Sequence, residues 1–235
     1  MKTKQIIKEK NGTTLVEMIV TLLLISIMMV MAAASLSSAS KIFARLQKMQ
    51  YAQSILDTTM TELRSITKDA CEYIKIYNSA VGGIGEQGGV EKGNALEFVN
   101  EEGYVVLVST DGCQKTDIYI AEKKTGEAKA VDSGQLLTRY YFRNSSDGTY
   151  TYQNEGVPVA RAVGEAFGKG FYMGNYLEVT YAFPNGVNVG DTMNSIVATV
   201  TLYTDQEKTE VIATDSEILE FRHSVIRKDD VTAKN

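Results

Sequence analysis

The sequence predicts an α+β protein, in which a long N-terminal helix packs on a mainly antiparallel β-sheet head. Two observations carry this prediction. No glycine or proline occurs between Thr13 and Tyr77, and apolar residues recur there at helical spacing. From residue 95 onward the apolar pattern has a period of two, typical of strands, and few helical patterns separate the strands.

The predicted helix has two parts and ends between Ser65 and Tyr77. Residues 13–40 are apolar on every side and carry no charge from Met18 to Ser40, which suits a membrane span or a helical bundle. Residues 41–77 are amphipathic, and their apolar stripe is typical of a helix lying on a sheet. The stripe consists of Ile42, Leu46, Met49, Ala52, Leu56, Met60, Leu63, Ile66, Ala70 and Ile74.

The predicted head follows a glycine-rich loop at residues 78–94 and covers residues 95–225, before a charged tail at 226–235. Its candidate strands are rich in β-branched and aromatic residues. They are 95–100, 104–109, 117–122, 136–143, 149–153, 176–183, 195–204 and 217–225. The glycine-rich segment 155–175 is predicted to be an irregular surface loop.

The charge pattern gives an orientation and argues against one class of partner. Four lysines against one glutamate precede the apolar run, which favours a cytoplasmic N-terminus and an exported C-terminal part. Lys41, Arg45 and Lys48 follow the run and weaken this bias. The full chain has a net charge of -5, and without residues 1–12 it keeps 20 basic and 28 acidic residues, a net charge of -8. We therefore expect no general nucleic-acid site.

A short motif opens the apolar run: Gly12-Thr13-Thr14-Leu15-Val16-Glu17. With the basic stub before it and the apolar residues after it, it resembles the cleavage and methylation signal of type IV prepilins and pseudopilins. The resemblance implies cleavage after Gly12 by a prepilin peptidase and methylation of the new N-terminus at Thr13. It also implies that Glu17 assists assembly by pairing with the N-terminal amine of a neighbouring subunit.

The resemblance implies a structural subunit rather than an enzyme. Such a minor pilin or pseudopilin belongs to a type IV pilus or a type II secretion-like filament. Its partners are other pilin subunits, membrane lipid and an inner-membrane assembly platform. It is a single-pass membrane protein with an extracytoplasmic head, and after assembly it lies in the pilus at the cell surface.

The sequence departs from the family at two points and leaves alternatives open. The family usually has Phe or Met where Thr13 stands, and many major pilins have a proline in the apolar helix, which this chain lacks. A secretory signal peptide could be cut at 32–34 or 38–40. A plain membrane anchor, and a membrane-tethered binding domain that does not polymerise, are the other readings. A lipoprotein is disfavoured because the first cysteine is Cys71.

The remaining chemical signals are few. Cys71 and Cys113 allow one disulfide in an exported domain, or two free buried thiols. Two cysteines and the single histidine, His223, do not suffice for a structural zinc site. The glycines at 83–88 match a G-x-G-x-x-G string but lack the strand-to-helix context of a dinucleotide site. We therefore expect no catalytic residues, cofactor or metal.

Overall fold

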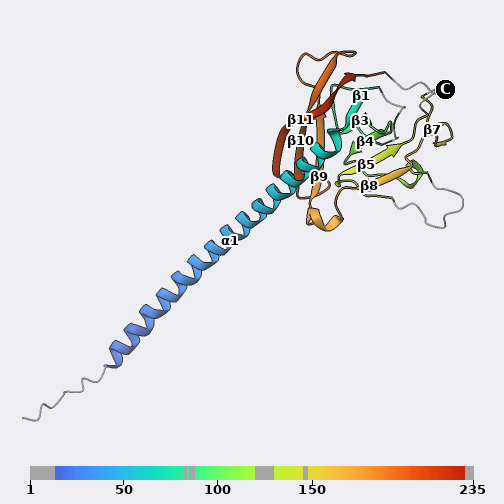
Figure 1. The fold of residues 1–235 in the computed structure, drawn as a ribbon. Helices are drawn as coiled ribbons and strands as arrows, with labels where there is room; N and C mark the ends of the chain where they lie inside the picture. Colours follow the sequence, from blue (N-terminus) through green and yellow to red (C-terminus); the bar gives the residue numbers. More distant parts are fainter. Residues whose placement is uncertain (1–13, 82–83, 85–87, 120–129, 145–147, 231–235) are drawn as a thin grey trace, which may run out of the picture. The chain divides into compact units, whose positions relative to one another are not determined.

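The structure is a computed structural model that describes residues 14–81, 84, 88–119, 130–144 and 148–230 (Figure 1). Helix α1, Leu15–Thr67, has 53 residues. The chain divides into two compact units, Met1–Lys48 and Met49–Asn235. The first contains the apolar part of α1. The second contains the last turns of α1 packed on a mixed, largely antiparallel sheet, so the predicted α+β class is confirmed.

The nine-stranded sheet has the order β2-β9-β10-β11-β1-β3-β4-β5-β8. Among the described strands, β1 and β11 pair in parallel, and the other neighbours pair antiparallel. The bounds are β1 Ala70–Tyr77, β2 Lys92–Gly93, β3 Ala95–Asn100, β4 Val105–Ser109, β5 Leu137–Tyr141, β8 Ala162–Glu165, β9 Tyr176–Ala182, β10 Thr192–Tyr203 and β11 Val211–Arg227. A separate small hairpin consists of β6, Gln153–Asn154, and β7, Val157–Pro158.

The helix ends earlier than the limit of the predicted segment 41–77. It stops at Thr67, and residues 70–77 form β1 instead. The last stripe members, Ala70 and Ile74, are four apart, and an even spacing satisfies strand alternation as well as a helix. In β1, Ile74 and Ile76 face one side of the sheet and Tyr73 and Tyr77 face the other. Such aromatic and β-branched residues favour a strand.

The strand predictions are confirmed for most of the head. Segment 95–100 coincides with β3, and segments 104–109, 136–143, 176–183, 195–204 and 217–225 fall on β4, β5, β9, β10 and β11. Segment 149–153 overlaps only an isolated bridge at Tyr150 and the start of β6. The described part of segment 117–122 forms no strand, because the 3₁₀ helix η1, Lys115–Asp117, occupies its start.

Several regular elements, among them the short strand β7, lie where the sequence predicted loop or tail. Strand β2 lies in the loop 78–94, β8 lies in the segment 155–175, and β11 extends to Arg227 in the predicted tail. A second 3₁₀ helix, η2 Lys169–Tyr172, also lies in 155–175. Strand β8 is four residues long and contains Gly164, so its local preference for a strand is weak and its pairing with β5 decides its conformation.

The sheet is buried on both faces. On one face, the last turns of α1 bury Ala52, Ile55, Leu56, Met60 and Leu63 against strands from both halves of the sheet, forming what we call the helix-side core. On the other face, the far-side core contains Tyr73, Tyr77, Val99, Leu107 and Tyr141, with Ala80, Ile84 and Ala160 from the connecting segments. The connecting segments therefore bury one face of the sheet, as the helix buries the other.

Charged side chains are built into the far side of the sheet. Glu97 of β3 is 0 % exposed and accepts hydrogen bonds from the hydroxyls of Tyr73 and Tyr77, each at 2.8 Å. Burial raises the pKa of Glu97, against the opposing effects of Lys75 and the two hydroxyls. Lys75 donates to the main-chain carbonyl of Asp230 at 2.9 Å. The start of the C-terminal tail is thus held against β1.

Arg139 of β5 ties the covering segments to the sheet. It is 1 % exposed, and its guanidinium donates to the carbonyls of Ala80, at 3.2 Å, and Gly112. It also lies 3.6 Å from the carboxylate of Asp117 in η1. A buried guanidinium must find such acceptors, because leaving it unpaired is costly. This one residue therefore fixes the position of η1 over the far face.

Candidate functional site

The predicted cleavage site, Gly12 and Thr13, lies outside the residues that the structure describes. The described chain begins at Thr14, and α1 begins one residue later, at Leu15. Of the predicted assembly and processing residues, Glu17 is therefore the one whose surroundings are seen.

Glu17 and Thr14 form a reciprocal cap at the start of the helix. The Thr14 amide donates to Glu17 Oε2 at 3.0 Å, and the Glu17 amide donates to Thr14 Oγ1 at 3.2 Å. The Thr14 hydroxyl also donates to Glu17 Oε2 at 3.3 Å. This is a capping box, in which two otherwise unpaired amides of the first turn are satisfied. The carboxylate also lies at the positive end of the helix dipole.

The sequence contains a signal for this cap, which lies within the motif that resembles the prepilin signal. Thr14-x-x-Glu17 directly before an apolar run is the pattern of a capping box. The resemblance to prepilins assigns Glu17 to assembly, and the structure adds a role within the chain itself. Glu17 is therefore explained in part without a second subunit.

The part of α1 that follows the cap carries an apolar surface on all sides. Every residue from 14 to 51 is exposed, including leucine, isoleucine, methionine and valine side chains throughout residues 15–31. By length and composition, α1 can cross a membrane, and it is the one such helix in the described part of the chain. Apolar surface of this extent needs lipid or other helices to cover it.

Three hydroxyl groups within this apolar part bond to the helix itself. Thr21 donates to the carbonyl of Met18 at 2.9 Å, Ser26 to that of Leu22 at 2.7 Å, and Ser35 to that of Met31 at 3.0 Å. Such bonds satisfy hydroxyls without an external partner, which matters in hydrocarbon. Glu17 is the charged group at the start of this apolar segment, and a charge in such surroundings gains from a partner of opposite charge.

Of the two states that the sequence allows for Cys71 and Cys113, a disulfide or two free thiols, the structure has the free thiols. Cys71 lies in β1 opposite Val99, near the start of that strand. Cys113 follows the last residue of β4, Ser109, which pairs with Ala95 of β3. Ala95 in turn pairs with Tyr77, the last residue of β1, so the chain reaches Cys113 from the end of the sheet opposite to Cys71. Burial raises the pKa of both thiols, which disfavours the reactive thiolate.

The single histidine, His223, takes part in a surface hydrogen-bond group. His223 Nε2 lies 2.9 Å from Glu101, which also binds Arg222 at 2.9 Å, and these hydrogen bonds lower the pKa of Glu101. The group is exposed and ties β11 to the turn after β3. The G-x-G-x-x-G string lies largely outside the described residues, and the next element in the chain is β2 rather than a helix. Within the described ranges no group of three or more His, Cys, Asp or Glu residues could hold a metal ion.

The described residues thus include one candidate membrane-spanning helix, and its C-terminal turns pack on the sheet. Comparison of the chain with protein-family models, curated proteins and solved structures found no match.

Proposed function

We propose that this protein is a structural subunit, a minor pilin or pseudopilin, of a type IV pilus or a type II secretion-like filament. The observation that carries the proposal is the position of Glu17, a single carboxylate at the start of a helical segment that is exposed and carries no further charge through Ser40. The Gly12-to-Glu17 motif and the basic stub before it support the same function, because they stand in the order that prepilin processing requires.

In the proposed mechanism, a prepilin peptidase cuts after Gly12 and leaves an ammonium group on Thr13, one residue before the cap. Within lipid, the Thr14 amide and hydroxyl partly compensate the charge of Glu17. During assembly, the ammonium group of one subunit approaches the Glu17 carboxylate of another. Each charge alone is costly among apolar helices, and pairing offsets much of that cost and sets the register between subunits.

The proposed location follows from the same segment. The N-terminal lysines stay in the cytoplasm, α1 crosses the membrane, and the sheet domain lies outside. Methylation of Thr13 belongs to the proposal as well. In this scheme the chain's partners are membrane lipid, the peptidase, other pilin subunits and the inner-membrane platform.

A second candidate function is a membrane-tethered extracytoplasmic binding domain that does not polymerise. The observation that favours it is the capping box, because it gives Glu17 a role within one chain. The two functions differ in whether the charge of Glu17 is needed beyond capping.

Two substitutions at Glu17 separate these functions. Glu17→Gln retains a side chain that can complete the capping box but removes the charge, whereas Glu17→Ala removes both. We expect both variants to insert into the membrane and both to be depleted in sheared filaments by about tenfold or more, as loss of a charge pair among apolar helices predicts. The measurement is the ratio of filament-bound to membrane-bound subunit by immunoblot.

The control is Gln53→Ala, an exposed change in the second unit of the chain. It should leave the ratio unchanged. If Glu17→Gln enters filaments as the unaltered chain does, the charge pair is not used and capping accounts for Glu17. If the unaltered chain is itself never found in filaments, the tethered domain is the better account.

A further inference from the structure

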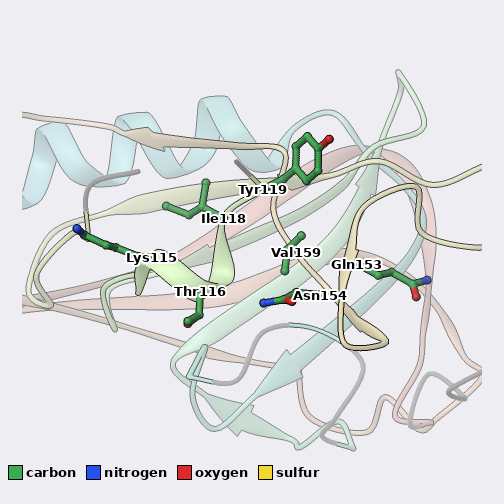
Figure 2. Close-up of a pocket in the computed structure, with 7 residues that line it drawn as sticks. All are labelled: Lys115, Thr116, Ile118, Tyr119, Gln153, Asn154 and Val159. Carbon is green, nitrogen blue, oxygen red and sulfur yellow. The ribbon is translucent and has the colours of Figure 1, made fainter. Parts of the chain in front are cut away.

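A pocket of about 460 Å³ lies over the far side of the sheet domain, between η1 and the β6–β7 hairpin (Figure 2). It belongs entirely to the second unit of the chain and is separate from the proposed assembly helix. Its volume is in the range of pockets that bind small molecules. The residues that line it are Lys115, Thr116, Ile118, Tyr119, Gln153, Asn154 and Val159.

The floor and one wall of the pocket are apolar and aromatic. Val159, which is 5 % exposed, and the half-buried Ile118 form the floor. Tyr119 forms the wall and keeps 36 % of its surface exposed. Its ring packs against Tyr152 with a centroid distance of 4.2 Å, and the Arg161 guanidinium lies 5.8 Å from its centroid. These contacts hold the Tyr119 ring in place.

Four polar side chains also line the pocket: Lys115 carries a charge, and Thr116, Gln153 and Asn154 are neutral. In Figure 2, the Asn154 carboxamide lies beside Val159 and points toward the side of Thr116. Gln153 points away from them and donates to the carbonyl of Tyr150 at 3.3 Å. Asn154 and Thr116 therefore present a carboxamide and a hydroxyl next to the apolar floor, groups that both donate and accept hydrogen bonds.

Both sides of the pocket are fixed by hydrogen bonds. The Tyr119 amide donates to Ala160 O and the Ala160 amide donates to Asp117 O, each at 2.8 Å, so η1 is joined to the segment after β7. Asp117 lies 3.6 Å from the buried Arg139. The hairpin turns through Glu155 and Gly156, both with positive φ as in a two-residue type I′ turn. A site that is formed before binding loses less entropy when its ligand arrives.

We propose that this pocket binds a neutral sugar ring, as part of a glycan outside the membrane. A pyranose has a face of C–H groups that packs on Tyr119, Ile118 and Val159, and hydroxyls that bond to Asn154 and Thr116. An anionic ligand is best held by a fork of cationic donors. The one charged residue that lines the pocket, Lys115, offers a single ammonium group, and the guanidinium of Arg161 lies over the rings of Tyr119 and Tyr152. The open, polar rim also suits a hydrated ligand better than a wholly apolar one.

The test uses the full chain in a zwitterionic detergent, because a detergent with a sugar headgroup would compete. The probes are the methyl glycosides of glucose, galactose, mannose and N-acetylglucosamine, observed by saturation-transfer NMR. At least one glycoside should receive saturation at its C–H protons. Tyr119→Ala and Asn154→Ala should each weaken its binding by about three- to tenfold, as expected for loss of one aromatic or polar contact.

Two controls keep this test decisive. Tyr203→Ala changes a half-buried tyrosine of β10, whose hydroxyl bonds to Glu178 at 3.2 Å, and should leave binding unchanged. Asn154 is exposed in the β6–β7 hairpin, so its replacement should leave the circular dichroism spectrum and melting temperature unaltered. Absence of saturation transfer to all four glycosides overturns the proposal. Binding that Tyr119→Ala and Asn154→Ala do not weaken, or that Tyr203→Ala weakens equally, also overturns it. The measurement needs no filament, so its result is independent of the proposed function.

Discussion

The two parts of α1 are continuous in sequence but differ in what covers them. Residues 14–51 expose every side chain, whereas residues 52–67 bury one stripe in the helix-side core. Leucine and methionine occur in both parts, but the first part carries no charge from residue 18 to 40, whereas the second has one apolar stripe and a charged face. The second part has a sheet to cover it within its own chain, and the first part needs lipid or other helices to cover it.

The largest expected effect comes from replacing one leucine in each part of α1 and comparing the free energies of unfolding. Leu63 is 0 % exposed and Leu23 is 58 % exposed. Leu63→Ala should lower the free energy of unfolding of the sheet domain by about 2–5 kcal/mol, because it leaves a cavity in a packed core. Leu23→Ala should change it by less than about 0.5 kcal/mol. Urea denaturation of the full chain in detergent measures both, and equal losses would contradict the division of the helix.

A smaller, pH-dependent change in the free energy of unfolding is expected from Glu97. Glu97 is buried within the sheet domain, whereas Glu17 is exposed. Burial raises the pKa of Glu97 above its usual value of about 4.5. The folded state thus binds a proton at Glu97 more tightly than the unfolded state. The contribution of Glu97 to the free energy of unfolding is fully present below about pH 4.5, and it is lost as the pH rises through the raised pKa.

Glu97→Gln, which cannot ionise, should therefore gain stability relative to the unaltered chain as the pH is raised from about 4.5 to neutrality. The measurement is the urea midpoint of both chains across this range. Glu102→Gln, at an exposed position in the turn after β3, is the matched control and should follow the unaltered chain. A pH dependence unchanged by Glu97→Gln would show that the buried carboxyl does not titrate differently on folding.

Much of this architecture could be predicted because its signals are local. The absence of glycine and proline predicts the helix, and alternation predicts β3 with its observed ends. The start of β1 could not be separated from the helix, since Ala70 and Ile74 satisfy both periods. The parallel pairing of β1 with β11 joins residues such as Tyr73 and Ile226, far apart in the chain, and no local pattern encodes it.

The candidate sites likewise could be predicted only where their signal is local in the sequence. The Gly12-to-Glu17 motif is contiguous, so the Thr14–Glu17 cap has a local signal in the sequence, although that cap was not predicted; processing after Gly12 stays a prediction. The free state of Cys71 and Cys113 depends on which strand end carries each residue, and this follows from register rather than spacing. The pocket beside Tyr119 joins η1 to a hairpin more than thirty residues later, brought together by Arg139 and the main-chain bonds of Ala160.

The most direct test of the central claim is the intact mass of the protein recovered from membranes of cells that carry a prepilin peptidase. We expect a chain that begins at Thr13, with or without one added methyl group, and a full-length chain when the peptidase is absent or when Gly12 is replaced by a bulky residue. A chain that keeps residues 1–12 in the presence of the peptidase, or one that begins near Ser40, would contradict it.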